Sequence, residues 1–239
     1  MTPSSMVIEK PLKKQLNAKA LAKHKKRFLR FFPKSFQDQR YIEWERTYKW
    51  EAHKLWMEHL NQKDFQDLLR AREYVEIANL ALKVESRTTF LFSFEKMALR
   101  DAVRTADGAS IFAQGIYDFL YEKGSAKTKF IEWIMAVADL PRVKSRVLSW
   151  PVLTIFPYLA QPNKHMILKP TAMRFAAQEL GYDFEYTSKP SWNTYEDLIR
   201  LANLTKEGIA DLKPKDYHDI QTFLWVIGSS EYERLAGEI

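Results

Sequence analysis

The chain has 239 residues, a formal net charge of +7, 46% hydrophobic residues and no cysteine. Its length allows one large or two small cores, and the lack of cysteine excludes disulfides and thiolate metal ligands. The main apolar stretch, Trp150–Ala160, is shorter than the roughly 20 residues that span a bilayer and contains two prolines. There is also no N-terminal apolar signal segment. We therefore expect a cytoplasmic protein without a transmembrane segment.

Positive charge is concentrated at the start of the chain. Residues 1–40 hold eleven Lys or Arg residues and two acidic residues, so they carry +9 while the rest of the chain carries −2. A localised positive field is the electrostatic signature of a polyanionic partner such as nucleic acid or an anionic membrane. We expect residues 1–34 to form a protruding basic arm and residues 35–239 to form a helical body.

A helix within the arm would place its cations on one face. This basic face consists of Lys19, Lys23, Lys26, Arg27 and Arg30. The opposite side carries Leu21, Phe28, Leu29 and Phe32. Over eleven residues the basic face is roughly 16 Å long, enough to meet several phosphates. The pattern predicts binding of DNA or RNA; a solvated helix surface, an acidic protein partner and a membrane surface are the alternatives.

Apolar residues at helical spacing recur along the rest of the chain. With only seven glycines and no alternating β-branched run, the sequence predicts an all-α fold, a single orthogonal bundle of several helices. Helices are expected at about 39–60, 63–86, 90–105, 109–122, 149–159 and 193–204, and around residues 130–138, 173–180 and 217–227. Thr171 is the expected N-cap of the helix that Gly181 ends, and Asp216 the expected N-cap of the last helix.

The segment 41–53 is dense in aromatic residues. One helical face is formed by Tyr41, Trp44, Tyr48, Ala52 and Leu55. Such a stripe is more typical of a core than of a platform for nucleic-acid bases, so we expect it to be buried. Trp50 points the other way, toward another helix or a ligand.

Five strings resemble an uncharacterised bacterial protein family of similar length, over most of the chain. They are residues 31–33, 48–53, 92–101, 165–170 and 219–226. The resemblance implies a bacterial protein but no activity.

Residues 139–228 are also similar to the C-terminal half of the helix-hairpin-helix DNA glycosylases. The similarity rests on residues 140–143, 170–181 and 225–228. It implies an all-α fold in which hairpin glycine amides hold DNA phosphate, with a catalytic lysine in some members and an acid after the hairpin. Arg142 and Lys144 replace the hairpin glycines here, and Lys169 stands near the expected acid. Both departures count against glycosylase chemistry.

Four polar residues make up the enzyme alternative, a pocket around His165, Lys169, Asp219 and Gln221. His165 suits acid–base chemistry and Lys169 can hold an anion. Each also has a structural explanation: Asp219 sits in a first helical turn, and Gln221 is a buried amide that needs partners. The sequence has no metal-ligand spacing and no phosphate-binding glycine loop, so we expect neither metal nor cofactor.

These patterns favour a non-catalytic nucleic-acid-binding protein that uses its basic N-terminal helix. An enzyme of unknown reaction and an adaptor for protein or membrane surfaces are the alternatives.

Overall fold

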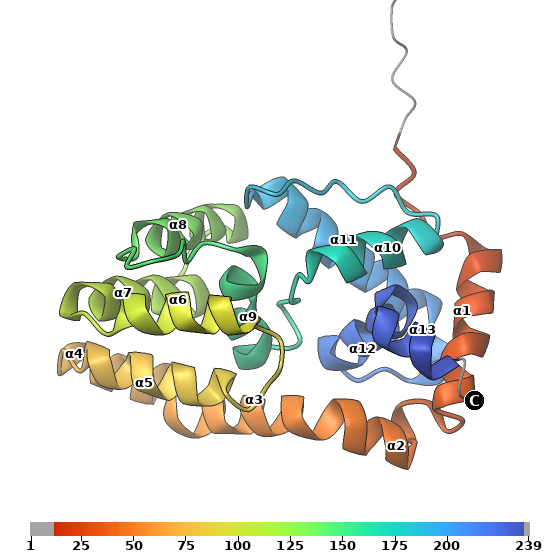
Figure 1. The fold of residues 1–239 in the computed structure, drawn as a ribbon, viewed down its shortest axis with the longest axis horizontal. Coiled ribbons are helices and arrows are strands. Elements are labelled where there is room, and N and C mark those ends of the chain that lie inside the picture. Colours follow the sequence, from red (N-terminus) through yellow and green to blue (C-terminus); the bar gives the residue numbers. More distant parts are fainter. Residues whose placement is uncertain (1–11, 237–239) are drawn as a thin grey trace, which may run out of the picture.

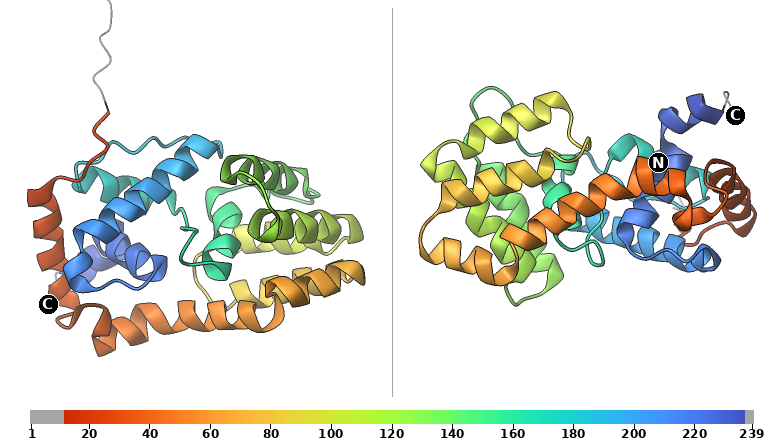
Figure 2. Two further views of the ribbon diagram at one scale, coloured as in Figure 1. Left: turned by 180° about the vertical axis from the view of Figure 1, so that it is seen from behind. Right: turned by 90° about the horizontal axis from the view of Figure 1, so that it is seen from below.

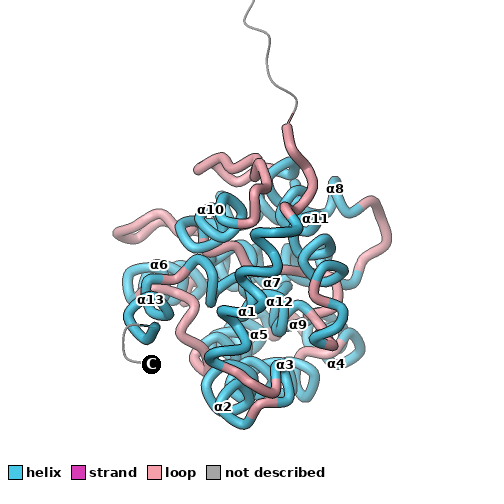
Figure 3. The backbone as a smooth tube through the Cα atoms, turned by 90° about the vertical axis from the view of Figure 1, so that its right-hand side faces the viewer, coloured by secondary structure: helices cyan, strands magenta, loops and turns pink. Residues whose placement is uncertain are grey.

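Helices and the loops between them make up residues 12–236, the part of the chain that the computed structural model describes (Figure 3). No strand occurs within these residues. The predicted all-α class is confirmed. Residues 1–11 of the predicted arm lie outside the described part.

Thirteen α-helices follow one another along the described residues. The first six are α1 (Ala18–Phe31), α2 (Gln39–Tyr41), α3 (Thr47–His59), α4 (Gln62–Arg70), α5 (Tyr74–Glu85) and α6 (Ser93–Val103). The others are α7 (Ala106–Tyr121), α8 (Ala126–Asp139), α9 (Trp150–Ala160), α10 (Pro170–Glu179), α11 (Trp192–Gly208), α12 (Tyr217–Gly228) and α13 (Ser230–Ala236). A π-helical turn, Ile42–Arg46, joins α2 to α3.

The helices gather at two ends of the molecule (Figure 1). At one end α7 packs against α5 and α8, and at the other α12 packs against α1, α10, α11 and α13. Between them α9 is buried along its whole length, which explains why its sequence is apolar on every side. Figure 2 shows α2, the π-helical turn and α3 running as a nearly continuous rod along one side of the molecule.

The first helix is part of the core. Phe28, Phe31 and Phe32 are buried, and the ring of Phe28 lies 5.4 Å from that of Phe223 on α12. Leu21, which was expected on this side, is half-buried. Three aromatic side chains on one face favour docking over exposure. The expectation of a protruding arm is therefore wrong for α1.

The predicted single helix at 63–86 is wrong as well. The helix ends after α4, where Arg72 adopts a positive φ of 59°. The amides of Arg72 and Glu73 donate to the carbonyls of Leu69 and Leu68, the pattern of a left-handed helix end. Glycine usually occupies this position, and without it the sequence carries no sign of the break.

Three helix boundaries test the predicted caps. Helix α10 begins at Pro170, one residue before the expected N-cap Thr171, because proline suits the first helical position. Gly181 follows α10 with a φ of 70°, as a helix end requires. Asp216 caps α12 as predicted, since its side chain accepts the amide of His218.

Candidate functional site

Helix α1 is held in a fixed orientation at its N-terminus and along its inner face. The side chain of Asn17 caps the helix by accepting the backbone N–H of Ala20 at 3.0 Å. The backbone N–H of Asn17 donates to the carbonyl of Leu180. On the inner face, His24 is buried with its Nε2 3.1 Å from the carboxylate of Glu179. The orientation of the outer face is therefore set by the fold.

The outer face carries the five cations of the basic face. They line one groove of about 970 Å³, together with Ala22 and Phe31. Lys19, Lys23, Lys26 and Arg30 are exposed, and Arg27 is half-buried. All five side chains thus adjoin the same volume, as their helical spacing predicts.

Few acidic groups neutralise this face. Among the described residues, Lys23 is the one member with an ion pair, and its Nζ lies 3.5 Å from Glu179. Lys25, which interrupts the inner face, pairs instead with Asp211 at 2.6 Å. The groove therefore presents concentrated positive charge.

Arg27 is the cation of the groove whose guanidinium has buried nitrogens without hydrogen-bond partners in the described part of the chain. Its Nε and Nη2 are shielded from solvent and have no hydrogen-bond partner among the described residues. A buried charged donor without a partner is costly.

The predicted pocket around four polar residues does not form. His165 contacts the hydroxyl of Tyr195 through Nδ1 at 2.8 Å, whereas Lys169 donates to the carbonyl of Phe90 at 2.6 Å. No hydrogen bond or ion pair within residues 12–236 joins either residue to Asp219 or Gln221. His165 and Lys169 lie in the segment between α9 and α10, whereas Asp219 and Gln221 lie on α12. The two pairs bind different partners, so the expected convergence of all four is wrong.

Burial also weakens the chemical case for His165 and Lys169. Desolvation lowers the pKa of His165 to about 3, assisted by nearby lysines, so its imidazole stays neutral. Burial likewise lowers the pKa of Lys169, while Glu95 acts in the opposite direction. Both side chains are best explained as satisfied structural residues.

Asp219 and Gln221 belong instead to a polar network between α12 and the π-helical turn. Asp219 accepts a hydrogen bond from the hydroxyl of Tyr41 and another from the guanidinium of Arg46 at 3.0 Å. Arg46 also binds Asp216 through two parallel contacts of 2.6 and 2.7 Å. Burial raises the pKa of Asp219, and Arg46 and Tyr41 oppose that shift.

Lys49 lies at the centre of this network and is fully buried. Its three protons are donated to Glu45 at 2.9 Å, Gln221 at 2.7 Å and Thr222 at 2.7 Å. The second oxygen of Glu45 accepts the hydroxyl of Tyr232 at 2.7 Å. Burial lowers the pKa of Lys49, and Glu45 counteracts this. The cluster around the Glu45–Lys49 ion pair thereby joins α3, α12 and α13.

The π-helical turn explains why the sequence pattern did not reveal Glu45 and Lys49. Its i to i+5 bonding adds one residue to the turn, so the buried stripe passes through Glu45 and Lys49. Trp44, expected in the core, is 46% exposed, and Tyr48 is half-buried. The one sequence signal was a Glu–Lys pair four residues apart beside aromatic residues, a spacing that usually marks a surface pair.

Trp50 points away from the core, as predicted. It lines a groove of about 570 Å³ together with Arg46 and His53. The guanidinium carbon of Arg46 lies 5.0 Å from the centre of the Trp50 ring, and the His53 ring lies 4.9 Å away. The side chain of Trp50 is 39% exposed beside these neighbours.

His218 is a buried histidine behind the network. Both ring nitrogens lack hydrogen-bond partners within the described residues, and the ring packs 4.7 Å from that of Tyr158. Burial lowers its pKa to about 3, although Asp216 acts to raise it. Below pH 6.5 the unfolded chain takes up a proton on this residue that the folded protein does not bind.

A pH dependence of stability follows from His218. Between pH 7 and pH 5 we expect this residue alone to reduce the free energy of unfolding by about 2 kcal/mol. Urea denaturation at the two pH values measures the change. His218→Phe, which keeps a ring against Tyr158, should show a smaller reduction; an equal reduction in the variant would assign the effect to other groups.

Metal ions and membranes require particular arrangements of side chains. Within residues 12–236, no group of three or more His, Asp or Glu side chains is placed to hold a metal ion. None of the described helices has the length and apolar character needed to cross a bilayer.

Comparison with known proteins adds no family. The chain matches no protein-family model, no curated protein and no solved structure. The resemblances to an uncharacterised bacterial family and to the glycosylases therefore stay predictions.

Proposed function

We propose that this protein binds nucleic acid, DNA or RNA, without catalysis, through the basic face of α1. The observation that supports this most directly is the shared groove of Lys19, Lys23, Lys26, Arg27 and Arg30. Phosphate groups would meet cations at intervals of about one helical turn, roughly 5.4 Å, along a rigidly docked helix.

The burial of the inner face favours nucleic acid over a membrane. An interfacial helix inserts an exposed apolar face into the lipid, but the aromatic residues of α1 are in the core. Its exposed side consists mainly of cations. The enzyme alternative has less support, because the four polar side chains proposed for its pocket do not meet.

Salt-dependent binding tests the proposal. We expect labelled DNA or RNA to bind at low salt, with log affinity falling as log salt rises at about 0.9 per duplex phosphate neutralised. Fluorescence anisotropy at several salt concentrations measures this slope. Vesicles containing anionic lipid are the control: absence of nucleic-acid binding at low salt, or tighter binding to vesicles, would contradict the proposal.

A further inference from the structure

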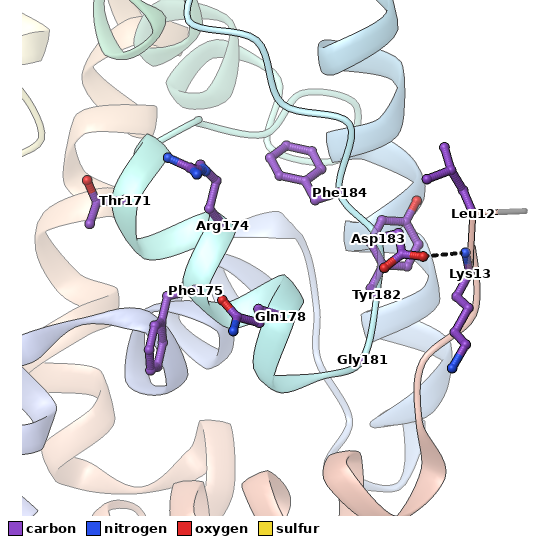
Figure 4. Close-up of a pocket in the computed structure, with 10 residues that line it drawn as sticks. All are labelled: Leu12, Lys13, Thr171, Arg174, Phe175, Gln178, Gly181, Tyr182, Asp183 and Phe184. Carbon is purple, nitrogen blue, oxygen red and sulfur yellow. Dashed lines mark hydrogen bonds between the residues drawn. The ribbon is translucent and has the colours of Figure 1, made fainter. Parts of the chain in front are cut away.

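Phe175 is an exposed aromatic residue on the outer face of α10. Its side chain is 40% exposed, and Figure 4 shows the ring projecting from the helix on the side away from Phe184. The aromatic contacts nearby join other groups, since Phe184 and Arg174 both contact Tyr186. Among the described residues the Phe175 ring has no aromatic or cationic partner, and 40% of the side chain is accessible to a ligand.

The position of Phe175 relates it to the basic face. Glu179 follows it by four residues and therefore lies on the same side of α10, one turn further on. The carboxylate of Glu179 contacts Lys23 at 3.5 Å and His24 at 3.1 Å. The C-terminal end of α10 thus adjoins the middle of α1, and Phe175 lies one helical turn beyond the contact with Lys23.

The outer face of α10 also borders a groove. Arg174, Phe175 and Gln178 line it on one side and the segment 181–184 on the other, and its volume is about 770 Å³. Arg174 supplies donors only, whereas the amide of Gln178 supplies both donors and an acceptor. All three side chains are exposed. An exposed aromatic ring on the same helix as such hydrogen-bonding groups resembles the surfaces on which unpaired bases stack.

We propose that the nucleic acid held by the basic face is single-stranded and that one of its bases stacks on Phe175. This inference rests on the proposed function. In a duplex the base faces are covered by their neighbours, and freeing one costs a few kcal/mol. A single strand presents base faces without that cost while its phosphates lie along α1. Phe175 thereby distinguishes single strands from duplexes, which the cations alone do not.

The test compares a single strand of about 15 nucleotides with a duplex of the same length, both measured by anisotropy. Phe175→Ala should weaken single-strand binding about 5- to 150-fold, the range for removal of one base stack, and leave duplex binding unchanged. Phe175→Trp should retain the affinity. Phe94→Ala on α6, where the side chain is 60% exposed, is the matched control and should change neither.

The outcomes separate the two proposals. If replacing all five cations of the basic face by Gln does not weaken nucleic-acid binding, the proposed function fails. The stacking inference alone fails if the five Gln replacements weaken binding but Phe175→Ala leaves single-strand affinity unchanged. It also fails alone if Phe175→Ala weakens duplex and single-strand binding equally. The stacking inference would also be overturned if Phe175→Ala weakened binding to anionic vesicles but left binding to oligonucleotides unchanged. Melting temperatures close to that of the wild type establish that the variants are folded.

Discussion

Removal of the five cations of the basic face should abolish most nucleic-acid binding. With Lys19, Lys23, Lys26, Arg27 and Arg30 all replaced by Gln, we expect affinity near physiological salt to fall on the order of 100-fold or more. The salt dependence should flatten by about one unit of slope for each phosphate that is no longer neutralised. The reason is that fewer counterions are released on binding. Anisotropy titrations across a salt series measure both effects.

A variant with the same net charge separates local from general electrostatics. Five exposed cations outside α1 serve for this: Lys63, Arg87, Arg104, Lys123 and Lys127. Their replacement by Gln should leave most of the affinity intact. If both variants bind equally weakly, the basic face has no special role. Circular dichroism should show the same helical content in each, since four of the five replaced side chains of α1 are exposed and its docking rests on the buried aromatic residues.

Loss of Lys49 should destabilise the fold strongly. Lys49→Ala leaves Glu45, Gln221 and Thr222 buried without their shared donor. We expect the free energy of unfolding to fall by about 3–5 kcal/mol, the usual effect of removing one partner of a buried ion pair. Urea denaturation at pH 7 measures the change.

Two further variants test the cause. Lys54→Ala, at an exposed position on the same helix, should change stability by less than about 0.5 kcal/mol. The double variant Glu45→Leu, Lys49→Met leaves no unpaired charge and should recover part of the stability. Recovery stays incomplete because Gln221 and Tyr232 each still lose a hydrogen-bond partner. A decrease below about 1 kcal/mol in Lys49→Ala would mean that water or rearranged side chains satisfy the remaining groups.

Local pattern predicted the fold class and most helices. Apolar spacing located α8, α10 and α12, and it placed Phe28 and Phe32 on the inner side of α1. The failures arose where the backbone departs from regular helix. The left-handed turn at Arg72 and the π-helical turn at Ile42–Arg46 depend on tertiary packing and leave no distinctive residue type behind.

The candidate sites divide in the same way. The basic face is a property of one helix, so its geometry follows from residue spacing alone. Arg46 and Asp216 are separated by 170 residues, and neither position suggests the other in a single sequence. The four-residue pocket failed because it joined polar residues by chemical type without any contact to bring them together.

The packing of α1 against α12 has a consequence for folding. Phe28 and Phe223 meet across 195 positions of sequence, so the inner face of α1 cannot complete its docking until α12 has been synthesised. At typical rates of translation that interval is roughly 10–40 s. During this interval the aromatic residues of α1 need protection from other apolar surfaces. Contacts between residues this distant in sequence also form slowly. We therefore expect the groove lined by its cations to be among the last features of the molecule to form.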